Sequence, residues 1–214
     1  MEIVVLMALA SATLFTVLGL SSRTTRQTIL FLALQAAAIG FVELMYCLIN
    51  LITGLHMEAL IDFLATFAEW FSCAAVSPLI IYWGMIKTED AIDQPIIGAR
   101  KAAMLVAAIT VSHLILGIWL LPLLPEKLET LPFVALMFSL PVLMMATRRD
   151  PLKILAGLNM AENALFPLLA ESPLSLIPFM LVLMIFVNIV GVFVITEAYR
   201  EYGTSTITKW RGAS

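Results

Sequence analysis

The chain has 214 residues, of which 62% are hydrophobic and only 13% charged, and its mean hydropathy is +1.03. An ordinary soluble domain carries about 25% charged residues. This composition therefore excludes a soluble globular protein and indicates that the lipid bilayer is the main solvent. Twelve Lys and Arg against fifteen Asp and Glu give a net charge of −3, so no basic excess is present for a nucleic-acid partner.

Cysteine and histidine are too few and too dispersed to suggest a metal centre. Cys47 and Cys73 lie inside apolar runs without CxxC spacing, and His56 and His113 are far apart in the chain. We therefore expect no metal site, no disulfide framework, no bound cofactor and no catalytic residue. The first apolar segment lacks a basic start, so we expect it to be a retained span and not a cleaved signal peptide.

Seven apolar stretches are long enough to cross a bilayer, which needs about 20 helical residues per span. Charged residues, glycines and prolines separate them. The predicted spans are 2–20, 28–52, 60–86, 102–124, 130–146, 151–170 and 174–198. The sequence thus predicts an all-α membrane protein, with a single integral membrane domain that forms a bundle of about seven transmembrane helices.

The positions of Lys and Arg predict the orientation of this bundle. With seven spans, eleven of the twelve basic residues fall on one side, and only Lys127 falls on the other. Because cytoplasmic segments retain positive charge, we expect the N-terminus outside the cell membrane and the C-terminus in the cytoplasm. The longest polar loop, residues 87–101, has mixed charge, and we interpret it as a solvated loop in preference to a docking surface.

Ionisable side chains inside the predicted spans are the candidate functional residues, because an ionised carboxylate at a helix centre costs about 2.5–3.5 kcal/mol. Glu162 lies near the middle of the sixth span, with Asn159 and Asn163 on its face and Pro167 shortly after. This pattern predicts a water or proton site. The alternative is a neutral glutamic acid that hydrogen-bonds a neighbouring helix.

Four further residues are candidates for an ion relay, each with an alternative role in packing. Glu69 lies at mid-depth in the third span, and Glu43 lies nearer the outer side in the second. His113 in the fourth span could relay protons or bond a carbonyl. Asn188 in the seventh could bridge water or pack helices. If they face one another, Glu69, His113, Glu162 and Asn188 form a lateral polar layer across the bundle.

Two segments carry a family resemblance: RRDPLKILAGLNMAENA at 148–164 and YREYGTSTITKWRG at 199–212. They resemble the K subunit of complex I and the C subunit of Mrp antiporters, and the chain as a whole resembles the hydrogenase-4 component E family of group 4 [NiFe] hydrogenases and formate hydrogenlyases. The resemblance implies that residues 130–214 form a K-subunit-like three-helix unit and residues 1–129 a four-helix extension.

The same resemblance implies a function and partners. It implies a membrane-arm subunit that contributes to proton or sodium translocation, surrounded by lipids, with antiporter-like subunits and the membrane anchor of the redox arm as partners. In K-type subunits a functional glutamate follows the Gly-Leu pair, where this chain has Asn159, and a second would fall near Val187 or Asn188. The resemblance therefore implies a relay shifted by one turn to Glu162, and the two-carboxylate relay is not reproduced residue for residue.

Three functions remain open on these observations. The first is an ion-translocation subunit in which Glu69 and Glu162 pass protons, while electron transfer belongs to partner subunits. The second is a structural spacer between antiporter-like subunits and the redox-arm anchor. A stand-alone secondary transporter is disfavoured because no inverted pair of broken helices is visible. The first two spans repeat the pattern of helix, basic loop and helix, with Gln35 near the position of Asn159, which suggests an internal duplication.

Overall fold

The computed structural model describes residues 3–90, 92–93, 95–123, 130–169 and 176–207. These residues are almost entirely helical, and five of their helices are long and apolar enough to cross a membrane. The five are α1 (Ile3–Ser21), α2 (Thr25–Ile52), the continuous helix His56–Lys87, α5 (Ala99–Leu120) and the part Phe179–Tyr202 of α9 (Leu176–Tyr202). These findings confirm the prediction of an all-helical protein whose helices are apolar enough to lie in a membrane.

The continuous helix His56–Lys87 changes its winding in the middle. It begins as α3 (His56–Glu69), continues as the π-helical segment η1 (Trp70–Val76) and ends as α4 (Ser77–Lys87). Pro78 stands at the start of α4 and has no amide hydrogen to donate to the preceding turn, so it favours a local departure from α-helical bonding. Such π-helical segments frequently occur at functional sites.

The remaining helices are shorter. They are η2 (Leu121–Leu123), α6 (Leu131–Thr147), α7 (Pro151–Ala164) and α8 (Phe166–Leu169). The predicted sixth span, 151–170, is thus divided at Leu165, just before Pro167. Among these elements α6 is the longest, and it contains Pro141.

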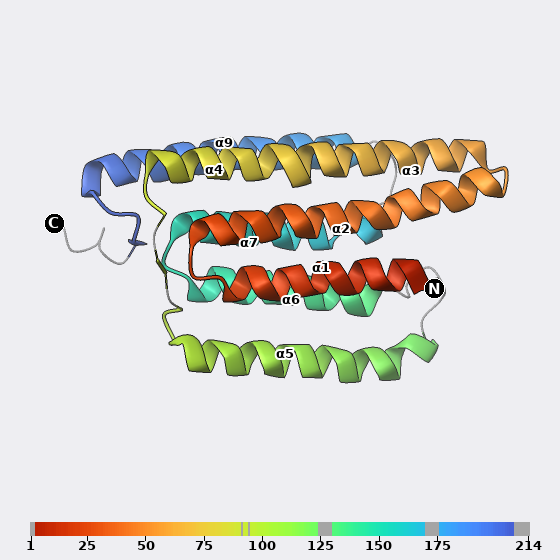
Figure 1. Ribbon diagram of the computed structural model, residues 1–214, viewed down its shortest axis with the longest axis horizontal. Helices are drawn as coiled ribbons and strands as arrows, with labels where there is room; N and C mark the ends of the chain where they lie inside the picture. The colour runs from red at the N-terminus through yellow and green to blue at the C-terminus, as the bar shows by residue number, and fades with distance from the viewer. Residues whose placement is uncertain (1–2, 91, 94, 124–129, 170–175, 208–214) are drawn as a thin grey trace.

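The helices form two three-helix units that lie side by side (Figure 1). Helix α1 packs against α6, α2 against α7, and α4 against α9. The partners α2 and α7 run in the same direction, because Thr25 bonds Asp150 and Gln35 bonds Met160, each pair 125 residues apart in the chain. Helix α5 packs mainly against α6, at one edge of the array.

Two apolar clusters fill the interior of the bundle. One contains Leu9 of α1 and Met137 of α6, and the other contains Leu32 of α2 and Met160 of α7, all fully buried. Each cluster draws residues from both halves of the chain. The segments 1–129 and 130–214 therefore pack together, since both contribute side chains to each cluster.

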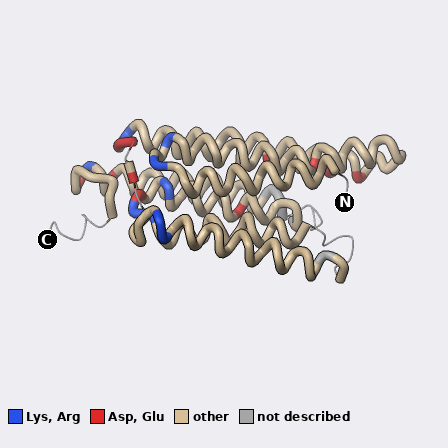
Figure 2. Tube along the Cα trace, turned by 60° about the horizontal axis from the view of Figure 1, so that its bottom comes forward, with Lys and Arg blue, Asp and Glu red and all other residues tan. Residues whose placement is uncertain are grey.

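Figure 2 shows the Lys and Arg of the described residues gathered at one end of the bundle, which we call the basic end. The loop after α4 folds across this end. The amide of Asp93 donates to the Arg23 carbonyl (3.0 Å), and Glu89 Oε1 accepts a bond from Ser205 Oγ (2.8 Å). Asp93 is only 7% exposed. The prediction of a solvated loop at 87–101 is wrong for Asp93, because this part of the loop joins the two three-helix units.

Candidate functional site

A layer of polar side chains separates the two apolar clusters. Along α2, for example, Leu32 belongs to one cluster, Ala36 belongs to the other, and Gln35 stands between them. We call the five polar residues at this level the polar layer, and each of them is at most 1% exposed: Thr16, Gln35, Ser77, Asn159 and Asn188. They come from five helices, so the layer crosses the whole interior.

Asn159 and Asn188 form a direct joint between α7 and α9. Each amide donates from Nδ2 to the other's Oδ1 at 2.7 Å. Asn159 Nδ2 also donates to the Leu155 carbonyl at 2.8 Å. The structure thus brings together two of the predicted relay residues, and it does so as a reciprocal amide pair.

Gln35 joins three helices at the same level. Its Nε2 donates to Thr16 Oγ1 of α1 (2.9 Å) and to the Met160 carbonyl of α7 (3.2 Å). Its Oε1 is buried and has no hydrogen-bond partner among the described residues. One acceptor in the middle of the bundle therefore remains available to a small polar ligand such as water.

Glu69 lies at the junction of α3 and η1, and its side chain is fully buried. No described nitrogen or oxygen donates a hydrogen bond to either of its carboxyl oxygens, and the Cys73 thiol is the polar group that interacts with them. Gly40 of α2 permits the close approach, since a Cβ at that position would lie 3.2 Å from Glu69 Cγ and 2.6 Å from Trp70 Nε1. Trp70 Nε1 donates to the Ala37 carbonyl at 3.1 Å, which fixes the η1 segment against α2.

Glu43 and Glu162 carry the other two carboxyl groups among the predicted relay residues. Glu43, 2% exposed, interacts electrostatically with Glu69. The Cys73 thiol, one turn from Glu69, is in electrostatic range of both Glu69 and Glu162. We call Glu43, Glu69 and Glu162 the carboxylate cluster. Cys73 therefore interacts with acids from both three-helix units.

The carboxylate cluster lies on the side of the polar layer that faces away from the basic end. Cys73 Sγ is 3.9 Å from Met184 Sδ, and Met184 is one turn from Asn188. Glu69 is a further turn beyond Cys73. At about 1.5 Å per residue, Glu69 is about 12 Å from the level of the asparagine pair. Glu69 therefore lies at a different depth from Asn188, and the condition for the lateral layer, that these residues face one another, is not met by this pair.

Most buried polar atoms without a partner belong to this region. Eight buried side-chain nitrogen and oxygen atoms have no hydrogen-bond partner among the described residues, and seven of them belong to five residues of the helix interiors: Gln35, Glu69, Ser77, Glu162 and Asn163. Both side-chain atoms of Asn163 are in this set. A buried polar group left without a partner costs about 1–3 kcal/mol. Water and small cations are the ligands that satisfy such groups.

His113 lies away from the carboxylate cluster. Its Nδ1 is 2.9 Å from the Ile109 carbonyl of the same helix, and its Nε2 is 3.2 Å from Ser139 Oγ of α6. Ser139 Oγ also donates to the Ala135 carbonyl at 2.7 Å. Within the described part of the chain, no hydrogen bond joins this group to the polar layer.

Three residues of the site were not among the predicted relay residues: Thr16, Gln35 and Ser77. Ser77 shares a face with Glu69, and Gln35 shares one with Glu43, so their helical spacing was the available signal. Thr16 carried no such signal, since a threonine in an apolar helix commonly bonds its own backbone, as it does here to Ala12 at 2.8 Å.

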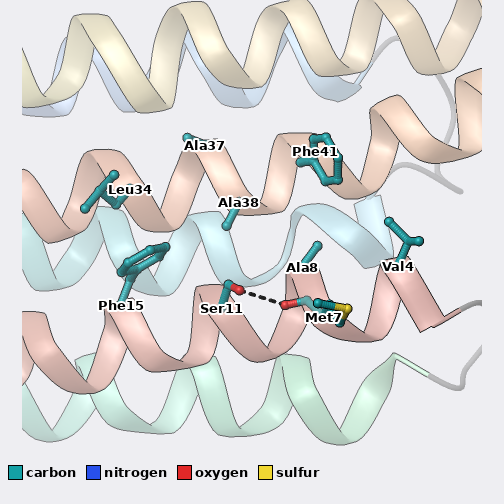
Figure 3. Close-up of a pocket in the computed structure, with 9 residues that line it drawn as sticks. All are labelled: Val4, Met7, Ala8, Ser11, Phe15, Leu34, Ala37, Ala38 and Phe41. Carbon is teal, nitrogen blue, oxygen red and sulfur yellow. Dashed lines mark hydrogen bonds between the residues drawn. The ribbon is translucent and has the colours of Figure 1, made fainter.

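A groove on the surface of the bundle differs from the candidate site in its chemistry. This groove of about 420 Å³ runs between α1 and α2 (Figure 3). Among its nine lining residues only Ser11 is polar, and its hydroxyl donates to the Met7 carbonyl at 2.8 Å. The groove therefore offers no free polar group to an ion.

Comparison of this chain with protein-family models, with curated proteins and with solved structures gives no match.

Proposed function

We propose that the protein is a membrane-arm subunit of a complex I-like assembly, such as a group 4 [NiFe] hydrogenase or a formate hydrogenlyase, and that it contributes to proton or sodium translocation. The observation that carries this proposal is the set of buried, unpartnered polar atoms in the carboxylate cluster and beside it. Carboxyl groups in surroundings of low dielectric exchange protons without a permanent charge. The assignment to a hydrogenase-type complex depends on the resemblance of residues 148–164 and 199–212.

The proposal includes seven spans, with α6 as the fifth, α7 and α8 together as the sixth, and α9 as the seventh. The N-terminus lies outside and the C-terminus in the cytoplasm. The gathering of Lys and Arg at one end of the bundle supports this orientation. Ions would then pass between neighbouring subunits through Glu69 and Glu162, with water bound at Asn163, Gln35 and Ser77.

The test uses membrane vesicles that contain the assembled complex. Glu69→Gln and Glu162→Gln keep the shape of each side chain and remove its exchangeable charge. We expect redox-driven ion uptake to fall at least tenfold in each variant, while electron transfer continues or is poorly coupled. Glu58→Gln is the matched control, because Glu58 is an exposed acid in the first turn of α3.

Assembly and ion specificity are measured in the same vesicles. A normal amount of assembled complex on a native gel shows that a loss of uptake has a local cause. Dependence of uptake on sodium in the medium distinguishes sodium from protons. Normal uptake in both glutamate variants would overturn the proposal.

A structural spacer is the second candidate, and the Asn159–Asn188 pair favours it. Both amides use their hydrogen-bonding groups on each other, as expected of residues that hold helices together. A spacer predicts that deletion of the protein abolishes assembly of the complex, whereas both glutamate variants pump normally. The same two measurements therefore distinguish the candidates.

A further inference from the structure

A cleft of about 330 Å³ opens at the basic end, between the C-terminal ends of α1 and α6 and the first turns of α5. One part of its lining is charged and contains Arg23, Asp93 and Arg148. The other part is apolar and contains Ala103, Val106 and Leu143. The cleft is therefore amphipathic, and its two parts lie at different depths along the bundle.

Arg148 lines this cleft and has one side-chain donor without a partner among the described residues. Its side chain is only 5% exposed; Nη1 donates to the Asp93 carbonyl (3.1 Å) and Nη2 to the Leu20 carbonyl. Nε is buried and has no hydrogen-bond partner among the described residues. Hydrogen bonds from a guanidinium group are strongest to anionic oxygens. An anionic oxygen is thus the acceptor that this position favours.

The local charge also favours an anion. Asp93 is the acid that lines the cleft, and its Oδ2 is engaged by Arg148 Nη1 (3.9 Å) and by the Arg149 amide (3.4 Å). Arg23 lies exposed in the cleft lining. Arg100 and Lys101 are exposed in the first turn of α5. Basic groups therefore outnumber the acid around the cleft.

The apolar part of the cleft follows α5 toward the middle of the bundle. Helix α5 has one buried residue, Gly117, at its far end, so its first turns pack loosely against the other helices. Ala103 and Val106 are small and leave room beside Leu143. A free phosphate would leave this apolar surface uncovered, whereas a ligand with an acyl chain would cover it.

We propose that this cleft binds an anionic glycerophospholipid, with its phosphate beside Arg23 and Arg148 and an acyl chain along α5 and α6. The lipid would tie α5 to the rest of the bundle at the basic end. This inference requires that the chain is embedded in a membrane, and it is independent of ion translocation.

The test measures lipid retention by the purified full-length protein in detergent, with native mass spectrometry. Phosphatidylglycerol, phosphatidylcholine and inorganic phosphate are the three probes. Arg23→Gln removes an exposed charge at the cleft, and Arg26→Gln removes an exposed charge outside it. Ala103→Phe fills the apolar part, and Ala108→Phe adds the same ring on an exposed position that does not line the cleft.

We expect the wild-type protein to retain phosphatidylglycerol at least threefold more than phosphatidylcholine. Arg23→Gln and Ala103→Phe should each lower the retention of phosphatidylglycerol at least threefold, while Arg26→Gln and Ala108→Phe leave it unchanged. Equal retention of the two lipids, or normal retention in Arg23→Gln, would overturn the proposal. Binding of inorganic phosphate that Arg23→Gln abolishes and Ala103→Phe leaves intact would also overturn it, in favour of a simple anion site.

Discussion

The protein buries ionisable groups in two regions, which differ in how many of the buried atoms have hydrogen-bond partners. At the basic end, Asp93, Arg148, Asp150 and Lys153 are each at most 7% exposed. We call these four residues the charge cluster. Within it, Arg148 Nε is the one buried side-chain atom without a hydrogen-bond partner among the described residues. In the carboxylate cluster, by contrast, three buried carboxyl oxygens lack a partner: both of Glu69 and one of Glu162.

The difference indicates different roles. The charge cluster combines both signs and bonds loop carbonyls, as when Lys153 Nζ donates to the Arg23 carbonyl at 2.6 Å. Such a network fixes one arrangement of the loops. Glu69 and Glu162 form no ion pair with a basic side chain among the described residues, so their carboxyl groups can change protonation or bind a cation. We expect substitutions in the charge cluster to change stability and substitutions near the carboxylate cluster to change transport.

The largest effect on stability is expected for Arg148→Met. The substitution leaves Asp93 buried without its basic partner and removes the bonds to two carbonyls. Breaking a buried ion pair in this way costs about 3–5 kcal/mol. Chemical denaturation in detergent measures the free energy of unfolding. Arg149→Met is the control, because that side chain is exposed, and an equal loss in both variants would contradict the prediction.

Gly40→Ala tests the carboxylate cluster without altering an acid. The new methyl group would meet the Trp70 ring and Glu69 Cγ, and overpacking of this kind costs about 1–3 kcal/mol. Because Glu69 must move, we expect ion uptake to fall several-fold in assembled vesicles. Gly84→Ala creates a comparable contact, 2.7 Å from Val192 Cγ1, on α4 and away from the carboxylate cluster. Uptake should stay normal in that control, and an equal fall in both variants would show that the effect is not specific to Glu69.

Asn188→Leu tests the contribution of the polar layer, which lies between the charge cluster and the carboxylate cluster, to stability. It breaks both bonds of the asparagine pair and leaves Asn159 Oδ1 buried without its donor. Hydrogen bonds between membrane helices are worth about 1–2 kcal/mol in model peptides, and we expect a loss of that order. The variant with both Asn159→Leu and Asn188→Leu should lose less stability than the sum of the two single variants. Strict additivity would show that the pair does not act as a unit.

The helices could largely be predicted from the sequence, whereas their pairing could not. The predicted ranges 2–20 and 130–146 differ by one residue at each end from α1 and α6, because the bilayer requires apolar runs that charges and prolines end. The contacts of Gln35 with Met160 and of Asp93 with Arg148 join segments more than 50 residues apart. Such contacts depend on how each helix is rotated and paired, and local hydropathy carries no information about that.

In the candidate site, too, the residues could be predicted from the sequence, whereas their contacts could not. Glu69, Glu162 and the two asparagines stood out as polar residues in apolar helices. The bond between Asn159 and Asn188 follows from the packing of α7 against α9. The contact of His113 with Ser139 follows from the position of α5 beside α6. The π-helical winding after Glu69 was also not predicted, since Pro78 signals a disturbance of the helix without specifying its kind.

The smallest expected effect on stability is a pH dependence that arises from Asp150 of the charge cluster. Burial raises the pKa of the Asp150 carboxyl above 3.8, although bonds from the Thr25 hydroxyl and the Leu152 amide oppose the shift. The folded state therefore binds a proton more tightly than the unfolded state. The resulting stabilisation is complete below pH 3.8 and is lost as the pH rises through the raised pKa. Asp150→Asn keeps one oxygen to accept from the Leu152 amide, places an amide nitrogen opposite the Thr25 hydroxyl oxygen, which can accept from it, and removes the titration. The stability of the variant relative to wild type should thus increase across this pH window, by less than the loss in Arg148→Met, and a relative stability that decreases with pH would show that the basic neighbours outweigh burial.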